Sequence, residues 1–152
     1  MPGTIAIALA LAVLATQTAQ TLPDDLARMA ASARLAAPIV GWCSGQFQSG
    51  RRSAYAVAES SSTGGGRYLV LEADAAVVEL APFTGRPDLA CYTPARARAL
   101  NSSIGQSGII HGKIEPRWPT TVICAFVDDT SAVCWQYAPG ERRFVRVGEW
   151  IT

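Results

Sequence analysis

The chain has 152 residues, of which 49% are apolar, and its 13 basic and 12 acidic side chains leave a net charge of +1. A chain of this length buries about two-thirds of its unfolded surface, which is enough for one domain with a hydrophobic core. Nucleic-acid binding is disfavoured, because phosphate-binding domains normally carry a clustered basic excess. We therefore expect a single small domain with no nucleic-acid partner.

The first 19 residues have the pattern of an export signal. Residues 5–14 are apolar without interruption, a run of about ten residues that suits a signal-peptide core and is too short to span a bilayer. Small and polar residues follow over 15–21, where we expect cleavage. No Lys or Arg precedes Ile5, which leaves a buried helix or an uncleaved anchor as the alternative. The prediction is a periplasmic or secreted protein with no membrane span after signal removal.

The sequence after the signal predicts a short helix. Residues 20–38 hold this helix, expected over 24–37, which starts at Asp24 and Asp25 and is ended by Pro38. Its apolar side chains recur at helical spacing and would pack on a sheet. The apolar stripe consists of Leu26, Met29, Ala30, Ala33 and Ala37.

Residues 39–152 read as one β-rich domain. The expected strands before the C-terminal region are 39–43, 54–59, 67–71, 75–80, 88–92 and 109–114, with turn-rich connections at 44–53, 60–66 and 82–87. The run 75–80 also fits a helical stripe, but Val77 and Val78 are β-branched and favour a strand.

A second helix is predicted over residues 93–103. Thr93 suits the N-cap and Pro94 suits the first turn, where its missing N–H is not needed. Gly105 and Gly108 would end this helix. The chain then continues into the strand that holds the only histidine, His111.

Residues 120–150 predict a three-stranded antiparallel meander. Turn-forming residues interrupt the apolar runs at 128–130 and at Pro139-Gly140. On the middle strand Val133, Trp135 and Tyr137 share one face, and Ala132, Cys134 and Gln136 share the other. The fold class we expect is therefore α+β: a small single domain with an antiparallel β-sheet that includes this meander, two short helices and disulfide bracing. An all-β fold with peripheral helices is the near alternative.

The even number of cysteines predicts disulfides. Cys43, Cys91, Cys124 and Cys134 are the four cysteines, and an oxidising compartment favours two bonds among them. Cys124 and Cys134 lie opposite each other in a simple hairpin register, near the Cα separation that a disulfide needs. This favours Cys124–Cys134 with Cys43–Cys91, among three possible connectivities. The chain has no Cys-x-x-Cys spacing and only one histidine, so we predict no metal and no other cofactor.

One segment suggests enzymatic chemistry. The core of the segment 41–45, Gly-Trp-Cys-Ser-Gly, resembles the nucleophile motif of the NlpC family of cell-wall peptidases. The resemblance implies a small cysteine hydrolase with Cys43 as the nucleophile and His111 as its base. The polar and glycine-rich residues after the motif differ from the apolar helix that follows it in that family. In an exported protein, a disulfide is the favoured role for Cys43.

The aromatic side chains are the remaining lead to function. Trp42, Trp118, Trp135, Tyr137, Phe144 and Trp150 gather in and around the C-terminal strands. Exposed in a row they could bind a partner, but a role in the core is favoured. With no catalytic residue assigned, we expect a non-enzymatic binding, inhibitor or interaction module that acts on an unidentified protein or envelope component. The hydrolase and a structural envelope protein are the alternatives.

Overall fold

The computed structural model describes residues 21–35, 37–74, 76–104, 111–127 and 131–151, with the backbone alone for 103, 104 and 111. The predicted signal, residues 1–19, lies outside this part of the chain. The described residues form two antiparallel sheets and two helices. The first sheet has the order β1 (Ile39–Gly45), β2 (Ala54–Ser60), β3 (Gly66–Leu71) and β4 (Val77–Phe83). The second has the order β5 (Leu89–Tyr92), β7 (Val122–Val127), β8 (Ser131–Ala138), β9 (Arg143–Ile151) and β6 (His111–Ile114).

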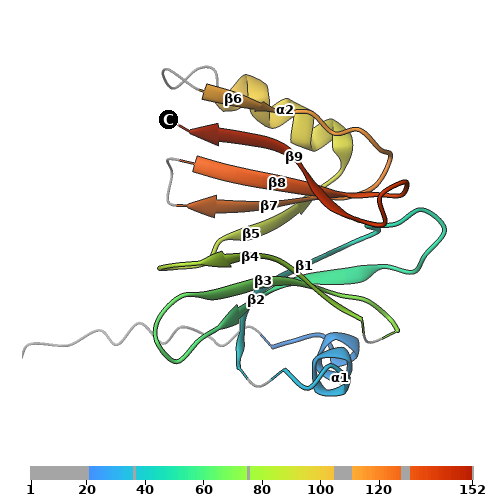
Figure 1. Ribbon diagram of the computed structural model, residues 1–152, viewed down its shortest axis with the longest axis vertical. Helices are drawn as coiled ribbons and strands as arrows, with labels where there is room; N and C mark the ends of the chain where they lie inside the picture. Colours follow the sequence, from blue (N-terminus) through green and yellow to red (C-terminus); the bar gives the residue numbers. More distant parts are fainter. Residues whose placement is uncertain (1–20, 36, 75, 105–110, 128–130, 152) are drawn as a thin grey trace, which may run out of the picture.

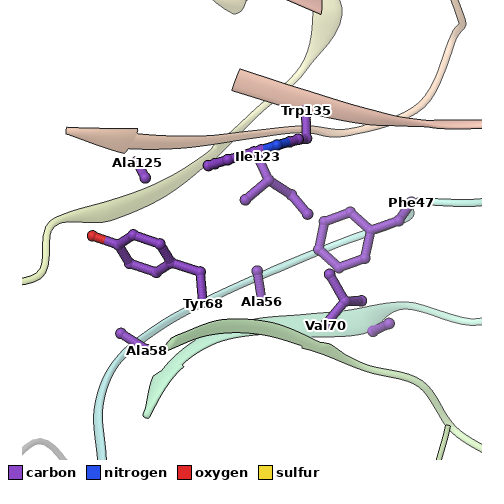
Figure 2. Close-up of a cluster of buried hydrophobic side chains, with 9 residues drawn as sticks. Phe47, Ala56, Ala58, Tyr68, Val70, Ile123, Ala125 and Trp135 are labelled. Carbon is purple, nitrogen blue, oxygen red and sulfur yellow. The ribbon is translucent and has the colours of Figure 1, made fainter. Parts of the chain in front are cut away.

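The predicted α+β single domain is confirmed, but its strands divide between two sheets instead of forming one. The inner faces of these sheets meet in a shared core, which Figure 2 shows. This core consists of Phe47, Ala54, Ala56, Ala58, Tyr68, Val70, Ile123, Ala125 and Trp135. Three alanines of β2 face larger side chains from the opposite sheet, so small and large residues interlock across the interface.

Helix α1 (Asp24–Ser32) covers the outer face of the four-stranded sheet. Its Leu26 is fully buried and packs with Val57 of β2 and Leu69 of β3. The Tyr55 hydroxyl donates to the two carboxylate oxygens of Asp25, at 2.8 and 2.9 Å, which adds a polar contact between helix and sheet. Burial and the Asp25 carboxylate both raise the pKa of Tyr55, so its phenol stays protonated and able to donate.

The end of α1 differs from the prediction. The helix stops at Ser32, five residues before the expected end at 37. Arg34 takes the left-handed conformation with φ +54°, and the N–H groups of Arg34 and Leu35 donate back to the carbonyls of Ala31 and Ala30. This pair of bonds is a Schellman motif, which normally uses glycine at the left-handed residue. Because arginine occupies that position here, the sequence carried no glycine signal for the helix end.

Helix α2 (Pro94–Ile104) covers the outer face of the five-stranded sheet. The Thr93 hydroxyl accepts from the N–H of Arg96 at 3.3 Å, as expected for an N-cap. The Asn101 side chain exchanges two hydrogen bonds with the backbone of Ile114 in β6, at 2.7 and 2.9 Å. Figure 1 shows α1 and α2 at opposite ends of the molecule, with both sheets between them. Gly105 and Gly108, predicted to end α2, lie outside the described residues.

Strand β4 runs further than the sequence indicated. The strand predicted over 75–80 is present, but it begins at Val77 and continues through Pro82 to Phe83, where we expected a loop. Proline removes a backbone donor, which a central strand does not tolerate. Because β4 is the edge of its sheet and pairs only with β3, the missing N–H of Pro82 is tolerated there.

The C-terminal meander is confirmed as β7, β8 and β9, with a turn at Pro139-Gly140. The turn predicted at 128–130 lies outside the described residues. The two faces of β8 separate as expected: Trp135 packs in the core between the sheets, and Cys134 packs under α2. Both faces of the five-stranded sheet are therefore covered, one by the other sheet and one by a helix.

Candidate functional site

All four cysteines are in disulfides. Cys43 of β1 is bonded to Cys91 of β5, with Cα atoms 5.6 Å apart, and this bond joins adjacent edges of the two sheets. Cys124 and Cys134 are direct partners in the β7–β8 register, with Cα atoms 4.1 Å apart. This is the connectivity that the hairpin geometry favoured.

The structure does not bring Cys43 and His111 together. Cys43 is bonded to β5, at one edge of the five-stranded sheet, and His111 begins β6, at the opposite edge. Four interstrand steps separate these edges, which amounts to about 19 Å at the usual strand spacing. A nucleophile and its base must lie within hydrogen-bond distance. The two residues are therefore not arranged as a catalytic pair.

Among the residues that the structure describes, no group of three or more His, Cys, Asp or Glu side chains could hold a metal ion. In the same part of the chain, neither helix has the length and apolar character needed to cross a membrane.

A groove opens between the two sheets on the side of β4. Its volume is about 490 Å³, within the range of small-molecule sites. One wall includes Tyr68, Ala81 and Phe83 of the first sheet, together with Arg86 from the connection that follows β4. The wall from the second sheet includes Ala125, Phe126, Val133, Trp135 and Arg146. The groove is thus the open margin of the core in Figure 2, where Tyr68, Ala125 and Trp135 lie.

The base of the groove is apolar and well fixed. Trp135 and Tyr68 are only 5% and 4% exposed, so their rings are held by the core and present one margin outward. The rings of Tyr68 and Phe83 lie 4.7 Å apart, which fixes the edge of β4 against β3. Burial is the main cause that raises the pKa of Tyr68. A hydrogen bond with the Asp88 backbone lowers this pKa and the Asp88 carboxylate raises it, and the net shift is upward, so the phenol is neutral at physiological pH.

Each wall of the groove contributes one arginine. Arg86 lies in the connection between β4 and β5, and Arg146 lies on β9 directly opposite Trp135 in the strand register. Arg146 forms a 3.7 Å ion pair with Glu149, and both side chains are at least half exposed. Among the described residues that line the groove there is no carboxylate. The charged side chains of the described lining are therefore the two arginines, and the base is apolar.

The sequence does not reveal this groove. Phe83 and Arg86 lie in the segment 82–87, whose composition predicts a loop, and Tyr68 lies within the strand predicted over 67–71. Arg146 is an indication, because it shares a strand face with Phe144, where a closed core would need another apolar side chain. The sequence predicts Trp135 either in the core or at a partner surface, and Trp135 is in fact buried and lies at the base of the groove.

The other aromatic side chains belong to the packed interior. Trp150 is 7% exposed and stacks edge-on with Phe126, and Phe144 contacts both Phe47 and Tyr137. The described residues of this sheet therefore do not form an exposed row of aromatic rings. A second hollow of about 380 Å³ lies beside α1, lined mainly by polar and charged side chains that include Asp25, Arg28 and Arg52.

Comparison of the chain with protein-family models, with curated proteins and with solved structures gave no significant match.

Proposed function

We propose that this protein is an exported, disulfide-braced domain whose function is to bind another molecule, without catalysis. The observation that carries the proposal is the disulfide between Cys43 and Cys91, which uses the nucleophile suggested by the sequence motif as a structural crosslink between the two sheets. Stable disulfides are typical of secreted and periplasmic proteins, and they are rare in reducing compartments. The apolar run at residues 5–14 supports the same compartment.

The hydrolase alternative lacks the chemistry that it needs. A thiolate is the reactive form of cysteine, and a sulfur in a disulfide cannot act as one. His111 is at the far edge of the other sheet, so reduction alone would leave Cys43 without an adjacent base.

The groove between the sheets supports a binding role. Ligand sites in proteins are usually preformed, mostly apolar hollows with a few polar groups at defined positions. The groove has this composition, and its base is part of the hydrophobic core, so it is shaped before any ligand arrives. We expect binding at this groove to be the function of the domain.

Thiol counting on the exported protein tests the proposal. The full chain is expressed with its native N-terminus, recovered from the extracytoplasmic fraction and denatured without reductant. We expect a chain that begins within residues 15–22 and has no titratable thiol. Cys43→Ser serves as the positive control, because it should release one thiol from Cys91. A wild-type protein that stays in the cytoplasm, or that has a free thiol at Cys43, would contradict the proposal.

A further inference from the structure

We propose that the groove binds a small amphipathic acid, with an apolar body against Trp135 and Tyr68 and a carboxylate between Arg86 and Arg146. This inference rests on the binding role proposed above and names the chemical class of the ligand. Two independent features of the groove carry it, the apolar base and the charge of the rim.

The base selects an apolar body. The largest side chains at the base of the groove are the nearly buried rings of Trp135 and Tyr68. Ala125 and Val133 are smaller apolar side chains of the same lining. Burying apolar surface is favourable in proportion to the area removed from water, so an apolar ligand body gains affinity at this base. A volume of about 490 Å³ suits a compact small molecule and is too small for a folded partner.

The rim selects a negative charge. Arg86 forms no ion pair with any described acidic residue, so its guanidinium is available to a ligand from one wall. Arg146 approaches from the other wall, and its existing partner Glu149 is exposed and 3.7 Å away. Exposed ion pairs of this kind contribute little, so an incoming carboxylate can replace Glu149. Guanidinium groups on two sides match the planar shape of a carboxylate.

Two exposed carboxylates adjoin the groove and oppose an anionic ligand. Glu149 pairs with Arg146, and Asp88 acts on the Tyr68 hydroxyl. Neither belongs to the lining, so they weaken the selection for an acid without reversing it. This competition gives a variant with a gain of affinity: Glu149→Gln frees Arg146 and should tighten the binding of an acid.

A matched pair of probes separates charge from apolar contact. Decanoate and decanol have the same chain length and differ in charge at neutral pH. Binding is measured by calorimetric titration of the oxidised mature protein, with decanoate below its micellar concentration and decanol below its solubility limit. We expect decanoate to bind roughly tenfold more tightly than decanol. The variants Arg86→Gln and Arg146→Gln should each lower the affinity for decanoate roughly three- to fivefold and leave the affinity for decanol unchanged. Arg96→Gln, on α2 at the other face of the same sheet, is the matched control and should change neither affinity.

A blocking variant tests the location. Ala81 lies on the edge strand β4 and lines the groove, so Ala81→Phe should fill the space and abolish binding of both probes. Circular dichroism and a thermal melt show whether the variant folds. A Glu149→Gln protein that binds decanoate about twofold more tightly at low salt would add independent support.

Equal binding of decanoate and decanol, or arginine variants with no effect, would overturn the inference. Decanoate binding that survives Ala81→Phe in a folded protein would place the ligand elsewhere and overturn it too. Failure of both probes to bind a fully oxidised exported protein would also overturn it, and would leave the binding role open to another ligand such as a peptide. Free thiols at Cys43 would contradict the proposed function itself.

Discussion

Gln136 is a fully buried amide that organises the loop before β7. Its Oε1 accepts from the N–H of Arg117 at 2.8 Å, and its Nε2 donates to the carbonyls of Trp118 and Thr120, both at 2.9 Å. The sequence placed Gln136 on the same strand face as Cys134, where a polar side chain is unexpected beneath a helix. The structure explains it, because the side chain satisfies backbone groups of Arg117, Trp118 and Thr120 in that loop.

Gln136→Leu should therefore be strongly destabilising. The leucine fills the space but leaves two N–H groups, of Arg117 and Trp118, and two carbonyl groups of the loop without their partner. We expect a loss of about 2–3 kcal/mol in the free energy of unfolding. Gln46→Leu is the matched control, since Gln46 is exposed and its side chain makes one 3.2 Å bond, and it should cost less than about 0.5 kcal/mol. Urea unfolding measures both, and similar losses would refute the assignment.

Gly45 allows β1 to approach the segment before β7. An added Cβ would lie 2.5 Å from Cγ2 and 2.6 Å from Oγ1 of Thr121. Thr121 cannot easily move, because its Oγ1 accepts from the Gln46 N–H at 3.0 Å and its own N–H donates to the Gln46 carbonyl at 2.9 Å. The contact holds the first sheet against the second at the end of β1.

We predict that Gly45→Ala lowers the thermal midpoint, with a cost of about 1–3 kcal/mol from the forced overlap. Gly140→Ala is the comparison, because no atom lies within 4 Å of a Cβ at that turn position. Gly140→Ala should leave the free energy of unfolding unchanged or raise it by up to about 1 kcal/mol, because alanine reduces the conformational entropy of the unfolded chain. A Gly45→Ala protein as stable as the wild type would show that the two segments separate freely.

At the scale of elements, the end of α1 is a point of strain. Arg34 is exposed and takes a left-handed conformation that costs a non-glycine residue roughly 1–2 kcal/mol. Arg34→Gly should relieve part of this cost and stabilise the protein by about 0.5–1 kcal/mol. Arg28→Gly, within the same helix, should instead destabilise by about 1 kcal/mol. Opposite signs for the two changes in chemical denaturation are the expected result, and equal signs would contradict the Schellman ending.

Local patterns in the sequence predicted most elements for a physical reason. The alternation along β2, with Ala54 and Ala56 on one side and Tyr55 and Val57 on the other, divides the shared core from the contact with α1. The same period of two predicted the faces of β8. The end of α1 was missed because arginine replaced the usual glycine, and the extension of β4 was missed because Pro82 is tolerated only at an edge that the sequence does not reveal.

At the scale of the whole molecule, the sequence predicted one sheet, whereas the structure has two. Alternating faces show that both sides of a strand are covered, but they do not say whether a helix or a second sheet covers them. The groove was beyond reach for a related reason. Arg86 and Arg146 are 60 positions apart in the chain, and only the packing of one sheet on the other brings their segments to one opening.

The two disulfides should act on different parts of the molecule. Cys43–Cys91 closes a separation of 48 residues and Cys124–Cys134 closes 10, for which chain entropy gives about 4 and about 3 kcal/mol. The double replacement Cys43→Ala and Cys91→Ala should raise amide exchange in β1 and β5. Replacing Cys124 and Cys134 by alanine should raise it in β7, β8 and α2 instead. An exchange pattern common to both variants would mean that the domain opens only as a whole.

The bond between Cys43 and Cys91 also has a mechanical meaning. It fastens the first sheet to the second along β1, whereas the groove opens beside β4, the opposite edge of the first sheet. The two sheets are therefore joined by different forces at their two margins. A covalent bond holds them together at β1, whereas at β4 they are held by the packing of Ala81 and Phe83 against the shared core.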